Sequence, residues 1–180
     1  MSQSEQSDNA LMAEKQERLE AFTKAMYARV TAEWEKSRPR LRKVGDWGFA
    51  ILSSPPRYRA RLAILGENPG FGTKDKVAPD TLPTRNSYID ADWPLAAALR
   101  RLFEAAGRMD TLQGAVISNF QFFKSPSLKA WRRLAPDHRR HLEEVSRQEV
   151  EQLIRLSEPR RLWCSAWVLS TGSRATRAPF

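Results

Sequence analysis

The stretch LAILGENPGFG, residues 62–72, joins a short apolar run to a segment rich in glycine. Its first four residues are typical of a strand that is buried on both faces in a parallel sheet. Residues 66–72 contain three glycines and one proline, and such a segment can continue neither a strand nor a helix. We therefore predict a buried strand that ends in a tight turn at Gly66.

Strand and helix patterns alternate along the rest of the chain. The predicted segments are, in chain order, a strand at 47–52, the strand at 62–65, a polar loop at 73–92, a helix from Asp92 to a C-terminal Gly107, a strand at 114–119, a helix at 136–157 and a strand at 162–166. Strands that alternate with helices favour a parallel sheet with helices on both faces. The predicted fold class is α/β, a three-layer α/β/α arrangement with a short, mainly parallel central sheet.

The sequence divides into one domain and its flanking segments. Residues 1–9 are polar, have nothing to bury and are expected to be disordered. Residues 10–37 carry apolar side chains every three or four positions, which predicts an N-terminal helix packed on the domain and ended by Arg38-Pro39. The α/β domain is expected to span residues 44–168 and to be followed by a tail over 169–180.

The charge balance favours a polyanionic partner. The 180 residues include 30 Lys and Arg against 21 Asp and Glu, which gives a formal net charge of +9 and a sequence pI near 10.2. Basic domains of this kind are typical of nucleic-acid binding. The single cysteine excludes an internal disulfide and four-cysteine metal sites, and no apolar run has the length of a membrane span. We expect a cytoplasmic monomer with no membrane partner.

Two unusual segments each follow a predicted strand. Residues 66–72 follow one strand, and residues 118–126 lie at and beyond the end of the next. Ligands of open α/β sheets bind outside the carboxyl ends of the strands. We therefore expect the two segments to converge on one site.

The first of these segments resembles a known motif. Gly66-Glu67-Asn68-Pro69-Gly70, placed after an apolar strand, resembles the first motif of the uracil-DNA glycosylase superfamily, most closely that of its mismatch-specific and single-strand-selective branches. Phe71-Gly72 is similar to the single-strand-selective branch, and Ser118-Asn119 resembles the base-reading asparagine at an equivalent strand end. The resemblance covers residues 47–167 and implies a uracil-DNA glycosylase-like domain.

The resemblance implies a DNA-repair glycosylase that hydrolyses the N-glycosidic bond of uracil or a related damaged base in DNA. Asn68 would hold and orient the attacking water, and Glu67 would either share that role or pack beside the loop. No cofactor and no metal is implied. His138 and His141 lie three residues apart without a third ligand nearby, so they do not predict a metal site.

The same resemblance implies a pocket for a base that has left the DNA stack. The turn that contains Gly66, Pro69 and Gly70 would border the base, and its backbone N–H groups would stabilise negative charge on a base oxygen. Phe71 would stack on the base. Asn119 would read the hydrogen-bonding edge, because an amide both donates and accepts.

A polar and basic stretch after the second strand is the expected DNA contact. Its members are Lys124, Ser125, Lys129, Arg132 and Arg133. A binding-only reading adds the cluster formed by Arg57, Arg59 and Arg61, and it predicts steeply salt-dependent binding.

The sequence departs from the superfamily after the last predicted strand. The second motif, a His- or Asn-Pro-Ser segment, does not occur there, so we expect a domain that is incomplete at its C-terminus. A second hypothesis is therefore a catalytically inactive or truncated glycosylase-like protein that binds nucleic acid without cleavage. A third is an unrelated α/β domain in which residues 66–70 form only a tight turn, since Asn, Pro and Gly are common turn formers.

Overall fold

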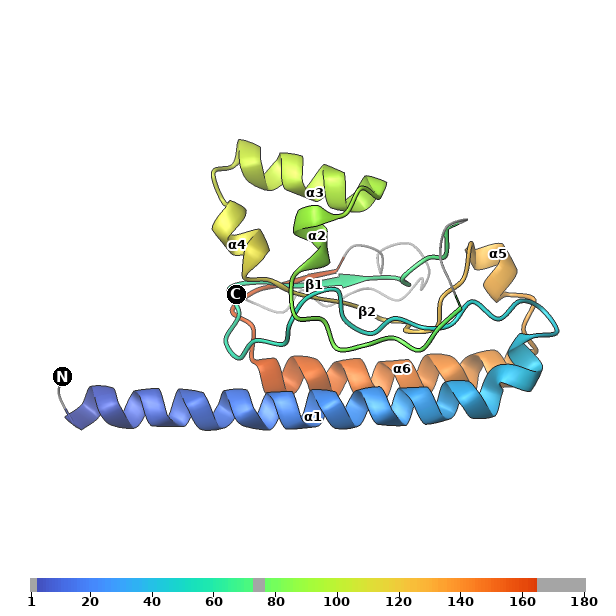
Figure 1. The fold of residues 1–180 in the computed structure, drawn as a ribbon, viewed down its shortest axis with the longest axis horizontal. Coiled ribbons are helices and arrows are strands. Elements are labelled where there is room, and N and C mark those ends of the chain that lie inside the picture. The colour runs from blue at the N-terminus through green and yellow to red at the C-terminus, as the bar shows by residue number, and fades with distance from the viewer. Residues whose placement is uncertain (1–2, 73–76, 165–180) are drawn as a thin grey trace, which may run out of the picture.

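The computed structural model describes residues 3–72 and 77–164 (Figure 1). Its elements are α1 (Gln3–Leu41), β1 (Ala63–Gly66), α2 (Ser87–Asp90), α3 (Pro94–Ala105), α4 (Met109–Gln113), β2 (Val116–Asn119), α5 (Leu128–Trp131), α6 (Pro136–Ser157) and β3 (Leu162–Cys164). The three strands form one parallel sheet in the order β2-β1-β3. The predicted mixed α/β class with a short parallel sheet is confirmed.

Apolar side chains cover both faces of the sheet. Ala63 and Leu65 of β1 belong to one hydrophobic cluster with side chains of α1 and α6, whereas Ile64 belongs to a second cluster with side chains of α2, α3 and α4. Figure 1 shows α1 and α6 below the sheet and α2 and α3 above it. Successive strand residues point to opposite faces, so a strand covered on both sides requires an unbroken apolar run.

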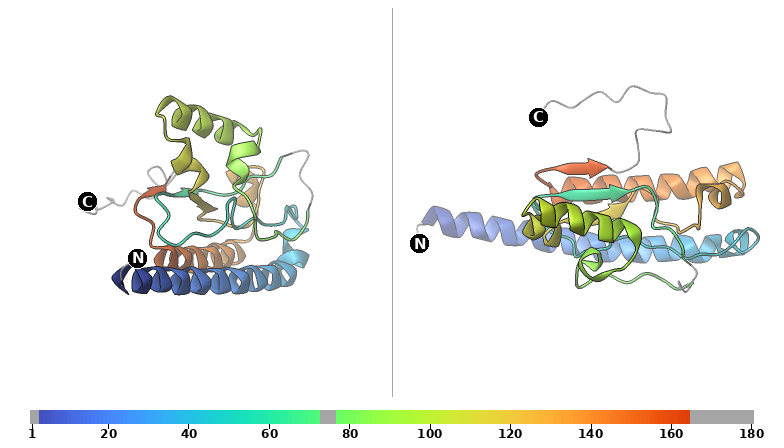
Figure 2. Two further views of the ribbon diagram at one scale, coloured as in Figure 1. Left: turned by 60° about the vertical axis from the view of Figure 1, so that its left-hand side comes forward. Right: turned by 90° about the horizontal axis from the view of Figure 1, so that it is seen from above.

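The N-terminal helix α1 lies alongside α6 and runs in the opposite direction (Figures 1 and 2). Its buried face carries Leu19, Met26, Val30 and Trp34, all of which belong to the same cluster as the β1 side chains. An ion pair between α1 and α6, Arg29 with Glu149 at 2.6 Å, lies beside this contact. The helix therefore supplies one wall of the core.

At its N-terminal end, α1 is longer than the predicted helix. It begins at Gln3, so residues 3–9 are helical, contrary to the expectation of disorder. Extending a helix that is already anchored adds one hydrogen bond per residue and needs no burial, which is why polar residues can continue it. Residues 4–14 are exposed and project past the end of α6 (Figure 1).

Among the described residues, no helix combines the length and apolar character needed to cross a bilayer.

At its C-terminal end, α1 continues through Pro39 to Leu41, contrary to the prediction that Arg38-Pro39 ends it. Pro39 lies in the last turn, where its missing N–H removes a single helical hydrogen bond. The N–H groups of Arg42 and Gly45 then bond back to the Arg38 and Leu41 carbonyls at 2.9 and 2.8 Å. These bonds close the helix end.

The predicted strand at 47–52 is wrong, because this segment pairs with residues 118–123 only through isolated antiparallel bridges. The Ala50 N–H donates to the Phe122 carbonyl at 2.9 Å, but two other backbone donors of the segment have side-chain partners. The Ile51 N–H donates to Asp80 Oδ2 at 2.8 Å, and the Leu52 N–H donates to the Tyr27 hydroxyl at 3.3 Å. A side chain from α1 and one from the long loop thus take the place of a neighbouring strand.

The predicted loop over 73–92 contains a short helix, α2, that the sequence analysis missed. Asn86 caps it, since its Oδ1 accepts from the Tyr88 N–H at 3.0 Å while its Nδ2 donates to the Leu112 carbonyl at 2.8 Å. Residues 73–76 of this loop lie outside the described residues, as do residues 165–166 of the last predicted strand and the predicted tail over 169–180.

The helix that follows begins at Pro94 after Trp93, so Asp92 is not its N-cap as predicted. Gly107 follows its end with φ +62°, a conformation that glycine adopts without strain. The short helices α4 and α5 were not predicted, because four or five residues show no usable periodicity. α6 spans the predicted range from Pro136 to Ser157.

Candidate functional site

The carboxyl ends of β1 and β2 lie side by side, as the sequence predicts. Gly66 is paired with Asn119 in the parallel register, and the next N–H, that of Phe120, donates to the Gly66 carbonyl at 2.9 Å. The Gln121 N–H then donates to the Glu67 carbonyl at 3.0 Å. A Cβ added at Gly66 would clash with Oδ1 of Asn119. Glycine is therefore needed here for space, to let the Asn119 side chain cross the end of β1.

Asn68 holds the turn after β1 to the segment after β2. Its Oδ1 accepts from the Gly70 N–H at 3.1 Å, and its Nδ2 donates to the Ser125 hydroxyl at 2.7 Å. Gly70 has φ +60°, which favours glycine at that position. The two segments that the sequence analysis expected to converge are thus joined by a direct side-chain hydrogen bond.

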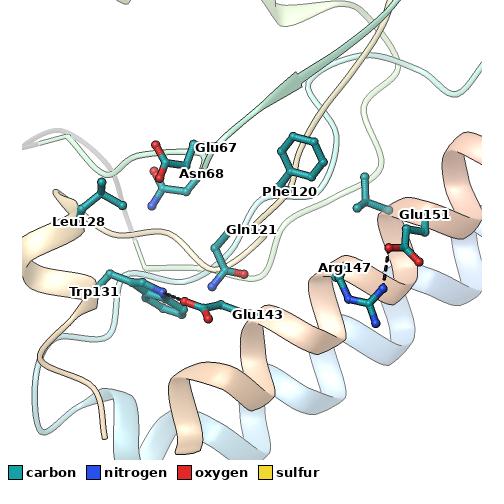
Figure 3. Close-up of a pocket in the computed structure, with 10 residues that line it drawn as sticks. Glu67, Asn68, Phe120, Gln121, Leu128, Trp131, Glu143, Arg147 and Glu151 are labelled. Atoms are coloured by element: carbon teal, nitrogen blue, oxygen red, sulfur yellow. Dashed lines mark hydrogen bonds and ion pairs between the residues drawn. The ribbon is translucent and has the colours of Figure 1, made fainter. Parts of the chain in front are cut away.

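A cavity of about 560 Å³ lies beside these strand ends (Figure 3). Its walls come from the turn after β1, the segment after β2, α5 and α6. The lining residues are Glu67, Asn68, Phe120, Gln121, Leu128, Trp131, Glu143, Arg147, Val150 and Glu151. Cavities of this size hold small organic ligands, and the mixture of apolar walls with a few polar groups is typical of ligand sites.

Polar side chains of α6 are anchored at the cavity wall. The Trp131 Nε1–H donates to Glu143 at 2.8 Å, which sets the plane of the indole ring. Arg147 is held between Glu151 and Glu144, each at 2.6 Å, and these hydrogen bonds and charges keep the pKa of the guanidinium above its ordinary value. The guanidinium is therefore already neutralised by neighbours on its own helix.

The side-chain amide of Gln121 has one atom that is hydrogen-bonded and one that has no partner among the described residues. Its Oε1 accepts from the Ser146 hydroxyl at 2.6 Å, while Nε2 is buried and has no hydrogen-bond partner among the described residues. The residue is only 8% exposed. An unpaired buried N–H donor is costly in a folded protein, so a ligand acceptor at this position would be stabilised by it.

Of the residues implied by the motif resemblance, Glu67 and Asn68 line the cavity. The predicted base-binding residues Gly66, Pro69, Gly70, Phe71 and Asn119 are not among the described lining residues. Phe71 is half-buried, and the Asn119 side chain is buried against Gly66. The structure therefore brings the first motif to the cavity through two adjacent polar side chains.

The expected DNA contacts separate into two groups. Lys129, Arg132 and Arg133 are exposed on or just after α5, with no ion pair to a described residue. Ser125, by contrast, is 1% exposed and its hydroxyl accepts from Asn68, so it supports the turn from inside and does not contact a nucleic acid at the surface. Lys124 is half-buried. Burial of the Asp80 carboxyl raises its pKa, and the positive charge of Lys124 acts in the opposite direction.

The arginine cluster at residues 57–61 lies elsewhere. It precedes β1 and therefore sits at the amino end of the strand, opposite the cavity, and Arg61 is paired with Asp110 at 2.5 Å. The two basic clusters of the binding-only hypothesis therefore do not lie together around this site.

The two histidines lie on α6 away from the cavity. His141 Nε2 is 2.8 Å from Glu33 Oε1, and both ring nitrogens of His138 are buried without a partner among the described residues. Burial, followed by the charge of Arg40, holds the pKa of His138 below its ordinary value. Over residues 3–72 and 77–164, no cluster of three or more His, Cys, Asp or Glu side chains is arranged to hold a metal ion.

Sequence reasoning missed the α6 wall of the cavity. Glu143, Arg147, Val150 and Glu151 follow the spacing i, i+4, i+7 and i+8, which places them on one helix face. That spacing was available in the sequence, but it is equally typical of a solvated helix face. Gln121 lies two residues after Asn119, and only its position in the fold distinguishes it.

Comparison of the chain with protein-family models, with curated proteins and with solved structures found no match.

Proposed function

We propose that this protein removes a damaged base from DNA by hydrolysis of its N-glycosidic bond, with uracil or a related base as the substrate. The observation that supports this most directly is the cavity at the carboxyl ends of β1 and β2, where Glu67 and Asn68 of the glycosylase-like motif stand beside the aromatic rings of Phe120 and Trp131. The proposal includes the finer fold assignment, a three-layer α/β/α arrangement of the uracil-DNA glycosylase type.

The residues at the cavity suit the chemistry of base removal. The cavity volume accommodates a base extruded from the stack, and flat aromatic side chains offer a stacking surface to any base. Asn68 is held in one orientation by its two hydrogen bonds, so it is preorganised to position a water molecule through the remaining N–H and lone pair. Glu67 is exposed and has no ion pair with a described residue.

In the proposed step, the water oxygen forms a bond to C1′ of the sugar while the C1′–N bond breaks. The electron pair of that bond leaves with the base, and a proton of the water passes to the Glu67 carboxylate. The exposed cations Lys129, Arg132 and Arg133 on and after α5 would bind the phosphates that flank the extruded nucleotide.

Replacing Glu67 by glutamine is expected to lower the rate of base release by about 100-fold, because the amide cannot accept the proton of the water. Asn68→Ala is expected to have an effect of similar size. The measurement uses single- and double-stranded oligonucleotides, each with one uracil or one oxidised or alkylated base, and detects abasic sites by strand cleavage in alkali. Thermal unfolding of each variant verifies that it is folded.

The matched control is Glu104→Gln, which removes a carboxylate from an exposed position on α3, outside the cavity lining. It should release bases at the rate of the unaltered protein. If the unaltered protein forms no more abasic sites than Glu67→Gln on every oligonucleotide, the proposed activity is wrong.

A second candidate function is binding of nucleic acid without cleavage, which the three exposed cations of the α5 region, without ion-pair partners among the described residues, favour on their own. Such binding releases counterions from the phosphates, and so its strength falls steeply as salt rises.

Replacing Lys129, Arg132 and Arg133 together by alanine is expected to weaken DNA binding and to reduce the slope of log K against log[salt] by about 2–3. Fluorescence anisotropy of a labelled oligonucleotide between low and moderate salt measures both quantities. The control of equal charge replaces Arg101, Arg108 and Arg155, which are exposed on or beside other helices. Equal slopes for the two triple variants would rule out a phosphate-binding surface at α5.

A further inference from the structure

We infer that the base taken by this cavity is a planar cation that carries a carbonyl oxygen, with N7-alkylated guanine as the chemical class. This inference rests on the proposed function and narrows its substrate. It is drawn from the charges, rings and unpaired amide at the cavity wall.

The charge of the cavity lining is negative although the whole chain is basic. Glu67, Glu143 and Glu151 carry three negative charges and Arg147 carries one positive charge, so the lining has a formal net charge of −2. The positive charge of Arg147 is also engaged by Glu144, outside the lining. Arg139 lies 3.7 Å from Glu143, whereas Glu67 has no ion pair among the described residues. A positively charged ligand is therefore favoured over a neutral or negative one.

The aromatic side chains favour the same ligand. Trp131 lies in the wall with its indole N–H bonded to Glu143, and Phe120 borders the cavity from the segment after β2 (Figure 3). The negative face of an aromatic ring attracts a cation, most strongly where water is excluded. A flat cationic base would gain both stacking and cation–π attraction at this wall.

The amide N–H of Gln121, which has no partner among the described residues, indicates that the cation carries a hydrogen-bond acceptor. Nε2 of Gln121 is a buried donor without a partner among the described residues, and Figure 3 shows this side chain reaching between the groups that line the cavity. Its Oε1 is already engaged by Ser146, so the free group offers hydrogen and not a lone pair. Because Nε2 has almost no accessible surface, the Gln121 amide must turn toward the cavity to meet an acceptor, and a ring carbonyl such as O6 of guanine is a suitable one.

The chemistry of departure agrees with this substrate. When uracil leaves, the electron pair of the glycosidic bond makes the base an anion, which the three carboxylates of the lining would repel. When N7-alkylguanine leaves, the same electron pair cancels the positive charge of the ring, and the base departs neutral. The water still bonds to C1′ and its proton still passes to Glu67, so the step is balanced in both cases.

Isothermal titration of the full chain with 7-methylguanosine and with guanosine tests the inference, because the two nucleosides differ by one methyl group and one charge. We expect 7-methylguanosine to bind about tenfold more tightly than guanosine. Glu143→Gln keeps an oxygen that can accept from the Trp131 N–H but removes one negative charge. It should reduce the ratio of the 7-methylguanosine affinity to the guanosine affinity several-fold. Glu104→Gln, outside the lining, should leave the ratio unchanged. Gln121→Met removes the amide N–H donor and should weaken the binding of both nucleosides.

Guanosine binding as tightly as 7-methylguanosine, no binding of either nucleoside, or a ratio that Glu143→Gln does not alter would each overturn the inference. A second arm measures base release from duplexes that contain either 7-methylguanine or uracil. Selective binding of the cation without any release would support this inference and contradict the proposed activity. Release of uracil in preference to 7-methylguanine would support the activity and contradict this inference.

Discussion

Replacing Trp34 by alanine is expected to lower the free energy of unfolding by about 3–5 kcal/mol, because a large side chain would leave a cavity in the core. Trp34 is 1% exposed, packs edge-on against Phe49 with ring centroids 5.6 Å apart, and donates its indole N–H to Asp46 at 3.0 Å. A loss of that size is a large part of the 5–15 kcal/mol that typically stabilises a domain. Urea unfolding followed by circular dichroism measures it.

Two further variants separate the contributions at this position. Trp34→Phe retains most of the buried volume but loses the hydrogen bond to Asp46, and it should cost about 1–2 kcal/mol. Trp93→Ala removes an indole that is 43% exposed and should cost less than Trp34→Ala by at least about 2 kcal/mol. Equal losses for the two tryptophans would show that α1 does not form part of the core.

Replacing Gly66 by alanine is expected to cost about 2–3 kcal/mol and to abolish base release, because the new methyl group would occupy the position of Asn119 Oδ1. The Asn119 side chain would have to turn away from the end of β1, next to the segments that carry Asn68 and Gln121. Denaturant unfolding and the abasic-site assay measure the two effects. Gly114→Ala is the control, since its nearest neighbour would lie at an ordinary 3.4 Å and its backbone suits alanine.

A double variant tests the cause of that loss. Asn119→Ala removes the atom that clashes, so the stability of Gly66→Ala/Asn119→Ala should recover most of the cost of the single change at Gly66. The coupling energy between the two positions is expected to be about 1–2 kcal/mol, as for residues in direct contact. Strictly additive losses would mean that the contact with Asn119 is not the cause of the loss at Gly66.

The strand ends are the part of the site that could be predicted from the sequence. Residues 62–66 specify a buried strand and its stop, and residues 114–119 specify the next strand, because hydrophobic pattern and glycine position are local signals. Parallel pairing of consecutive strands then brings Gly66 beside Asn119. The alternation of elements likewise predicted the α/β class and the extent of α6.

The predictions that were wrong concern long-range competition for hydrogen bonds and space. Residues 47–52 have a strand pattern, yet the N–H groups of Ile51 and Leu52 donate to Asp80 and Tyr27, which lie far from them in the chain. The side chains of residues 4–9 are exposed, yet these residues extend a helix that is anchored further along. A local sequence pattern does not indicate which distant group will form a hydrogen bond with a backbone N–H.

The sequence alone therefore determined β1, β2 and the turn after Gly66, since each of these depends on residues close together in the chain. The convergence of the motif with Asn119 followed from the general rule that the carboxyl ends of parallel strands lie at one edge of a sheet. The tertiary structure alone decided that Asn68 is hydrogen-bonded to Ser125 and that Gln121 has an amide donor with no partner among the described residues. It also decided that Glu143, Arg147 and Glu151 of α6 line the same cavity. The physical reason is that a cavity is the space left between packed elements, so its shape and charge depend on how helices and loops far apart in the chain pack against one another.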